Sequence, residues 1–315
     1  MERRELERRN FLQVFGALGA AAALPAAFPT PALAKPYDPA AKFDLKVSEM
    51  PYRRNGAGRQ LYARVYQPQG AGPFPLVLDL HGGAWTRKDR SAEEPIDRAI
   101  AASGVVVAAI DLTLSGEAPY PANVQDANYG IRWLKSKARE WNADGSSVGI
   151  YGSSTGGHIA ILLAMRPKDA RYNAIPLEGS SNIDAAVAYV ACRSPITDPY
   201  TRFQQAEKMK RDTLINASKA YFQPWESIHE ANPQQILERR EPVALRPLLI
   251  MQGGLDDNVL PAVQQKFADT YRAAGGDCRY ELFEHSEHEW TGKPGPQTNR
   301  AYEMVKSFIA RNVSS

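Results

Sequence analysis

The sequence predicts an α/β protein built on an eight-stranded, mostly parallel sheet with helices on both faces. The chain has 315 residues, of which 43% are hydrophobic and 23% charged, so it can bury a large core. From residue 76 onward, short apolar runs alternate with longer helical patterns, as in crossover units of a parallel sheet. In one such pattern, Ala127, Ile131, Leu134 and Ala138 recur at three- and four-residue intervals and form an apolar stripe.

The individual elements follow in chain order. Residues 43–50 and 60–67 alternate in polarity, and we expect them to form an opening antiparallel pair. Six further apolar runs predict strands at residues 76–80, 105–110, 148–151, 186–191, 248–251 and 279–283. Helical patterns occupy residues 91–103, 124–141, 157–165, 261–274 and 299–311.

A connection of nearly fifty residues interrupts this alternation. Residues 193–241 contain aromatic and proline residues among charged ones. Connections of this length inside a compact domain are usually functional or flexible. We therefore expect a single catalytic domain at residues 35–315, with a helical cap at about residues 193–241 lying over the carboxyl ends of the strands. A surface excursion remote from the site is the alternative.

The cap segment also carries an excess of basic residues. Between residues 193 and 225 there are six basic residues (Arg193, Arg202, Lys208, Lys210, Arg211 and Lys219) and three acidic residues (Asp198, Glu207 and Asp212). One interpretation is an anionic substrate, such as a carboxylated monoester. The composition favours the other interpretation, a solvated face of a cap helix.

The first 34 residues are predicted to be an export signal. Paired arginines at Arg8 and Arg9 precede Phe11, an Ala- and Gly-rich stretch and a small-residue cleavage site that ends at Ala34. This pattern resembles a bacterial twin-arginine signal, although Glu7 stands where Ser or Thr is usual. It predicts a periplasmic or secreted protein.

Charge and hydropathy limit the partners. The net charge is only +3, without a basic run, so we expect no nucleic-acid partner. No stretch of 18 uninterrupted apolar residues occurs, so we expect no stable membrane insertion. Cys192 and Cys278 are the only cysteines. We place them near opposite edges of the sheet, too far apart for a disulfide, and expect two free, packed thiols.

The most specific motif is GSSTG at residues 152–156, directly between a predicted strand and an apolar helix. This is the setting of a nucleophile elbow, in which a strained turn projects the hydroxyl of Ser154 from the sheet. Side chains two positions away on either side would collide, which explains Gly152 and Gly156. The sequence therefore predicts Ser154 as a nucleophile.

A serine nucleophile needs a histidine base and an acid that orients it. Of the five histidines, His288 follows the last strand on a loop that can fold back over the sheet, whereas we expect nearby His285 to be a surface residue. After strand 248–251 comes GGLDDNV at residues 253–259, which offers Asp256 and Asp257. We prefer Asp256, three residues before Val259, and Asp257 stays open. The order Ser, Asp, His is that of α/β-hydrolases.

The tetrahedral intermediate of acyl transfer also needs N–H donors. The sequence HGGAW at residues 81–85 follows a strand, where a loop with few side chains can present backbone amides. The N–H of Thr155 would be another donor. We expect Trp85 and Trp290 to line a largely apolar substrate pocket.

Together these motifs, with Asp126 in the helix after Pro121, span about residues 59–311 and resemble the hormone-sensitive-lipase-like branch of α/β-hydrolases. The resemblance implies Ser154, Asp256 and His288 as the triad, and Gly83, Ala84 and Thr155 as the oxyanion donors. Two residues depart from the pattern: Ser153 stands where an acidic residue is usual, and Ala84 where a third glycine is common. The His-Gly-Gly-x-Trp form is similar to kynurenine formamidases and to bacterial feruloyl and acetyl esterases.

The sequence thus predicts a serine esterase that cleaves small to medium carboxylic esters through an acyl-enzyme, with water as second substrate. An arylformamidase or other small-amide hydrolase with the same triad is the alternative, and a non-enzymatic binding module on this scaffold is a weaker one. We expect no metal or organic cofactor, because no Cys/His cluster with zinc-ligand spacing occurs.

Overall fold

The computed structural model describes residues 37–180 and 182–313. The predicted export signal at residues 1–34 lies outside these ranges. No helix within them is long and apolar enough to span a membrane.

The described strands form one eight-stranded sheet in the order β1-β2-β4-β3-β5-β6-β7-β8. The antiparallel pairings are β1 (Leu45–Arg54) with β2 (Gln60–Pro68), and β2 with β4 (Val106–Ile110). All other neighbours are parallel, through β3 (Phe74–Leu80), β5 (Ala143–Ser153), β6 (Tyr189–Arg193), β7 (Leu248–Gly253) and β8 (Cys278–Phe283). The predicted mostly parallel sheet is confirmed.

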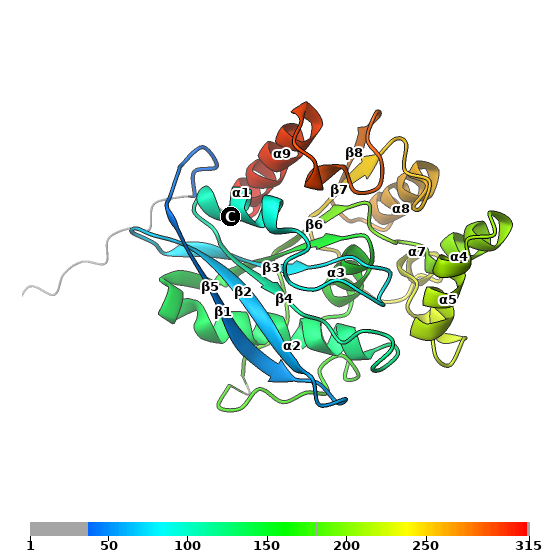
Figure 1. Cartoon of the computed structure of the whole chain (residues 1–315), viewed down its shortest axis with the longest axis horizontal. Helices are drawn as coiled ribbons and strands as arrows, with labels where there is room; N and C mark the ends of the chain where they lie inside the picture. The colour runs from blue at the N-terminus through cyan, green and yellow to red at the C-terminus, as the bar shows by residue number, and fades with distance from the viewer. Residues whose placement is uncertain (1–36, 181, 314–315) are drawn as a thin grey trace, which may run out of the picture. The chain divides into compact units, whose positions relative to one another are not determined.

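Helices cover both faces of the sheet (Figure 1). Apolar residues of α1 (Glu94–Ala102) and α9 (Pro296–Val313) pack in one hydrophobic cluster. Apolar residues of α2 (Ala122–Lys137), α3 (Thr155–Met165) and α8 (Pro261–Ala273) pack in the other. The expected stripe on α2 is fully buried at Ala127, Ile131 and Leu134, so burial of this face holds the helix on the sheet.

Two strands extend four and five residues beyond their predicted limits, and the differences for the other strands are smaller. β1 continues to Arg54, past a register shift between Pro51 and Arg53, and β5 begins at Ala143. Both extensions consist mainly of polar or exposed residues. Apolar periodicity cannot reveal such residues, because backbone pairing rather than burial places them in the sheet.

The long insert contains four helices: α4 (Pro199–Lys208), α5 (Asp212–Tyr221), α6 (Ser227–Glu230) and α7 (Pro233–Glu238). Its residues touch loops that follow two parallel strands. Tyr221 stacks on Trp85, after β3, and Arg202 hydrogen-bonds Asn258, after β7. The insert therefore packs at the carboxyl end of the sheet.

The cysteines are free and buried, as expected, but they do not lie at opposite edges of the sheet. Cys192 is on β6 and Cys278 on β8, and both strands pair with β7. With one strand between them, their backbones are separated by about 10 Å. That spacing still exceeds the ~7 Å Cα limit for a disulfide.

Candidate active site

Ser154 occupies the sharp turn between β5 and α3. Its φ of +52° and ψ of −114° lie outside the regions that residues with side chains usually adopt. A Cβ at Gly152 would lie 2.8 Å from the backbone of Gly156, and a Cβ at Gly156 would collide with the carbonyl of Leu80. The two glycines are therefore required by the close approach of β5, α3 and the end of β3.

Ser154, His288 and Asp256 form a continuous chain of hydrogen bonds. His288 Nε2 lies 2.9 Å from Ser154 Oγ, and His288 Nδ1 lies 2.7 Å from Asp256 Oδ2. The three residues come from the ends of β5, β7 and β8, which the parallel sheet brings to one edge. A carboxylate at Nδ1 fixes the hydrogen on that nitrogen and leaves Nε2 to accept the serine proton.

Asp256 is placed to remain ionised. Its side chain is fully buried, and burial raises its pKa. The hydrogen bond and charge of His288 and the backbone N–H of Val259 outweigh burial and hold the pKa of Asp256 below its usual value. Its Oδ1 accepts from the N–H groups of Asn258 (3.0 Å) and Val259 (2.8 Å). The loop after β7 thus fixes the carboxylate that faces His288.

The loop after β3 lies against the serine turn. A Cβ at Gly82 would be 3.2 Å from Ser154 Cβ, so the two backbones are in direct contact there. Gly83 and Ala84 have φ values of +111° and +54°. In residues 37–180 and 182–313, the N–H groups of Gly83, Ala84 and Thr155 donate to no protein acceptor. Such unpaired donors are what an oxyanion site requires.

A buried ion pair that the sequence did not reveal joins the serine turn to the histidine loop. Arg193 contacts the backbone on both sides: its carbonyl accepts from the Ser154 N–H (2.9 Å), and its side-chain Nη1 donates to the carbonyl of His288 (2.5 Å). Its Nη2 binds Glu93 at 2.9 Å, and Ser153 Oγ donates to the same carboxylate at 2.5 Å. Glu93 and Arg193 are one hundred residues apart, so no local pattern could have identified them.

The two tryptophans assigned to the substrate pocket are both enclosed. Trp85 is 3% exposed, and its ring stacks on Tyr221 at 4.5 Å and meets Phe222 edge-on. It therefore links the loop after β3 to the cap. Trp290 is in the hydrophobic cluster of α1 and α9, with its ring against Phe283. The structure thus places Trp290 in this hydrophobic cluster.

The other candidates for base and acid lie elsewhere. His285 is exposed, His158 is buried with Nε2 2.7 Å from the Ala231 carbonyl oxygen, and His229 contacts Gln235 within the cap. Asp257 is exposed and forms an ion pair with Arg211. The described residues contain no group of three or more His, Cys, Asp or Glu side chains arranged to hold a metal ion.

These features define an α/β-hydrolase: a mostly parallel sheet, a serine turn after the fifth strand, a histidine after the last strand, and a carboxylate between the two in the chain. Within that class, the chain belongs to the BD-FAE family, which matches residues 64–270.

Curated relatives are named as esterases, and solved structures of esterases share the fold. The chain is 30% identical over 164 residues to carboxylesterase NlhH of Mycobacterium tuberculosis, covering 51% of this chain and 49% of the relative. It is 25% identical over 252 residues to a probable isoprenylcysteine alpha-carbonyl methylesterase of Oryza sativa, covering 76% and 57%. The chain spans about half the length of the first of these relatives.

Among solved structures, Thermogutta terrifontis esterase 2 phosphorylated by paraoxon aligns with a TM-score of 0.67 and 19% identity, covering 84% of this chain and 94% of that one. Esterase B from Lactobacillus rhamnosis aligns with a TM-score of 0.69 and 20% identity, covering 86% and 89%. At these identities the likeness supports the fold.

Proposed function

We propose that this protein is a serine esterase in which Ser154 is the nucleophile, His288 the general base and Asp256 the orienting acid. The observation that carries the proposal is the unbroken hydrogen-bonded chain from Asp256 through His288 to Ser154, with distances of 2.7 and 2.9 Å. The relatives named as carboxylesterases support an ester as the substrate.

The geometry supports a two-step acyl transfer. Ser154 Oγ attacks the ester carbonyl carbon while its proton passes to His288 Nε2. The C–O bond to the alcohol then breaks, and His288 returns the proton to the departing oxygen. Water, deprotonated by His288, attacks the acyl-enzyme and releases the acid. The N–H groups of Gly83, Ala84 and Thr155 would stabilise the oxyanion in both steps, each contributing roughly 10²–10³ in rate.

Replacing Ser154 tests the proposal. We expect Ser154→Ala to lose all but about one percent of the activity on p-nitrophenyl esters, because Ser154 carries the hydroxyl that is hydrogen-bonded to His288. A fluorophosphonate probe should label the wild-type protein and the exposed-site control Ser146→Ala, but not Ser154→Ala. Circular dichroism should show the same fold for all three. A Ser154→Ala variant that keeps its activity would contradict the assignment.

The proposed substrates are small to medium carboxylic esters. A small cavity near the serine turn is lined by four apolar residues, Ile196, Val259, Leu260 and Val263, together with polar residues that include Arg202 and Asn258. The N–H of Ile196 donates to the Ser154 carbonyl. We expect rates on p-nitrophenyl esters to depend on acyl length, and equal rates from acetate to decanoate would contradict this. Comparison of N-formylkynurenine with p-nitrophenyl acetate tests the alternative arylformamidase activity.

We further propose that the protein is exported through the twin-arginine signal at residues 1–34. The support is the sequence pattern around Arg8 and Arg9. Replacing both arginines with lysine in the full chain should retain the protein in the cytoplasm of a bacterial host. Unchanged appearance in the periplasmic fraction would reject this route.

A further inference from the structure

Arg202, on cap helix α4, is a buried cation without an acidic partner. Arg202 is only 6% exposed, and it forms no ion pair among the described residues. Nε donates to Asn258 Oδ1 at 3.1 Å, Nη1 is buried without an acceptor, and no hydrogen bond involves Nη2. An unpaired buried guanidinium is costly, so its retention calls for a ligand.

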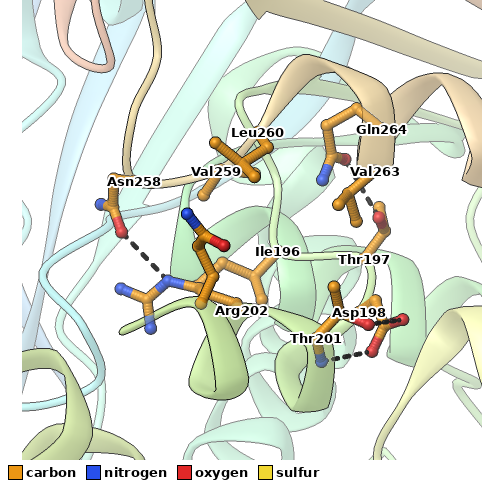
Figure 2. A pocket seen from close by; sticks show the side chains of 11 residues that line it. Ile196, Thr197, Asp198, Thr201, Arg202, Asn258, Val259, Leu260, Val263 and Gln264 are labelled. Carbon is orange, nitrogen blue, oxygen red and sulfur yellow. Dashed lines mark hydrogen bonds between the residues drawn. The ribbon is translucent and has the colours of Figure 1, made fainter. Parts of the chain in front are cut away.

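The surroundings place Arg202 at the proposed active site. Its guanidinium lies 5.6 Å from the ring centroid of Trp85, the residue after the oxyanion donor Ala84. Asn258, which holds Nε, also donates its backbone N–H to the triad carboxylate of Asp256. In Figure 2 the Nε of Arg202 is directed at Asn258, and the two terminal nitrogens point away from the other labelled side chains.

The nearby acids are already occupied. Asp256 accepts from His288, Gln252 and two backbone N–H groups. Asp198 caps α4 through Thr201 and accepts from Asn232, and Asp257 pairs with Arg211. Burial lowers the pKa of Arg202 to about 10, against the attraction of Asp256, so the guanidinium remains charged at neutral pH.

We propose that Arg202 binds a carboxylate carried by the substrate, so that the preferred substrates are esters bearing a free carboxylate. Two terminal N–H groups without acceptors match the two oxygens of a carboxylate, and such bidentate pairs are among the stronger hydrogen bonds in proteins. This inference rests on the proposed esterase function and adds its substrate class. The carboxylate belongs either to the acyl part, as in a dicarboxylic monoester, or to the alcohol part, as in an acylated hydroxy acid.

Matched ester pairs test the proposal. For the acyl side, hydrolysis of monoethyl succinate, glutarate and adipate is followed by pH-stat titration beside ethyl butyrate, pentanoate and hexanoate. For the alcohol side, 4-acetoxybenzoate is compared with p-tolyl acetate. We expect one series to favour its charged member by at least about tenfold in kcat/KM. Arg202→Gln should lower that value by about 10- to 100-fold and change the neutral ester by less than about threefold.

Two further variants complete the test. Arg202→Lys keeps the positive charge but loses the paired N–H donors of the guanidinium, so it should retain part of the preference for the charged ester. This variant also tests the proposal if Arg202→Gln does not fold. Lys208→Gln, which removes an exposed cation from the same helix α4, should leave the preference unchanged. Equal rates on charged and neutral esters in both series, or an equal loss on both in Arg202→Gln, would overturn the carboxylate site and leave the esterase intact. Absence of all hydrolysis and of Ser154 labelling would reject both.

Discussion

Asp256 illustrates how single residues in this site depend on their neighbours. The Asp256 carboxylate is buried, yet its pKa is lowered because His288 and backbone N–H groups stabilise its charge. Replacement by asparagine preserves the shape but removes the acceptor that fixes the hydrogen on Nδ1. The imidazole can then present the wrong tautomer to Ser154.

We therefore expect Asp256→Asn to lower kcat by about 10³–10⁴ with little loss of stability. Steady-state kinetics on p-nitrophenyl acetate measure the effect. The adjacent Asp257→Asn is the matched control, because Asp257 is exposed and faces Arg211. Equal losses in the two variants would contradict the choice of Asp256 as the acid.

Residue type and chain order predicted Ser154, His288 and Asp256, because strained turns and strand ends leave local signatures. They could not distinguish the roles of Trp85 and Trp290. Both are apolar residues beside motif positions, and only the packing shows that Tyr221 covers one and Phe283 the other. The unusual position of Arg202 was likewise hidden, because a basic residue on a helix is normally solvated.

At the scale of elements, the buried pair Glu93–Arg193 joins α1, β5, β6 and the loop that carries His288. The side chains of both residues are at most 5% exposed, and Arg193 contacts the backbone of both His288 and Ser154. Removing one partner would leave the other charge buried without a counter-charge, which typically destabilises a protein by about 3–5 kcal/mol.

We predict that Arg193→Met lowers the free energy of unfolding by about 3–5 kcal/mol and also lowers kcat, because the His288 loop loses its donor. Adding Glu93→Gln removes the unpaired buried charge of Glu93, so the double variant should regain much of the stability but not the kcat. Urea denaturation and single-turnover kinetics separate the two effects. If kcat returned together with stability, the pair would have no positioning role.

The existence of the strands and of the covering helices followed from periodicity, since each element buries an apolar face of its own. A helical cap was expected from the length of the insert. The bounds of its helices and the contacts of cap residues with Trp85 and Asn258 were not, because contacts between residues that are over one hundred or over fifty positions apart depend on the assembled fold. The separation of Cys192 from Cys278 was overestimated, because the apolar runs do not show which strands are neighbours, and a single strand, β7, lies between β6 and β8.

At the scale of the whole molecule, the described residues include two buried carboxyl groups, on the sheet and on the helix that covers it, that lack hydrogen-bond partners. Asp79 on β3 and Asp97 on α1 are buried, and none of their carboxyl oxygens has a partner. Burial raises both pKa values well above the usual value. The pKa of Asp79 is raised further by Glu93 and lowered by Arg193. The pKa of Asp97 is raised further by Asp79, Glu93 and Glu94 and lowered by Arg64.

This arrangement predicts how stability depends on pH. A carboxyl whose folded-state pKa is raised binds its proton more tightly in the fold, so its contribution is fully present below the unfolded pKa near 3.8 and is lost as pH rises through the folded pKa. Each retained proton lowers the free energy of unfolding by up to about 1.4 kcal/mol per pH unit in that window. Asp97→Asn removes one such group, so its advantage over wild type should grow from pH 4 to pH 8. Urea unfolding across this range measures the difference, with exposed Asp277→Asn as control. A difference between Asp97→Asn and wild type that stays constant with pH would show that Asp97 is not protonated in the fold.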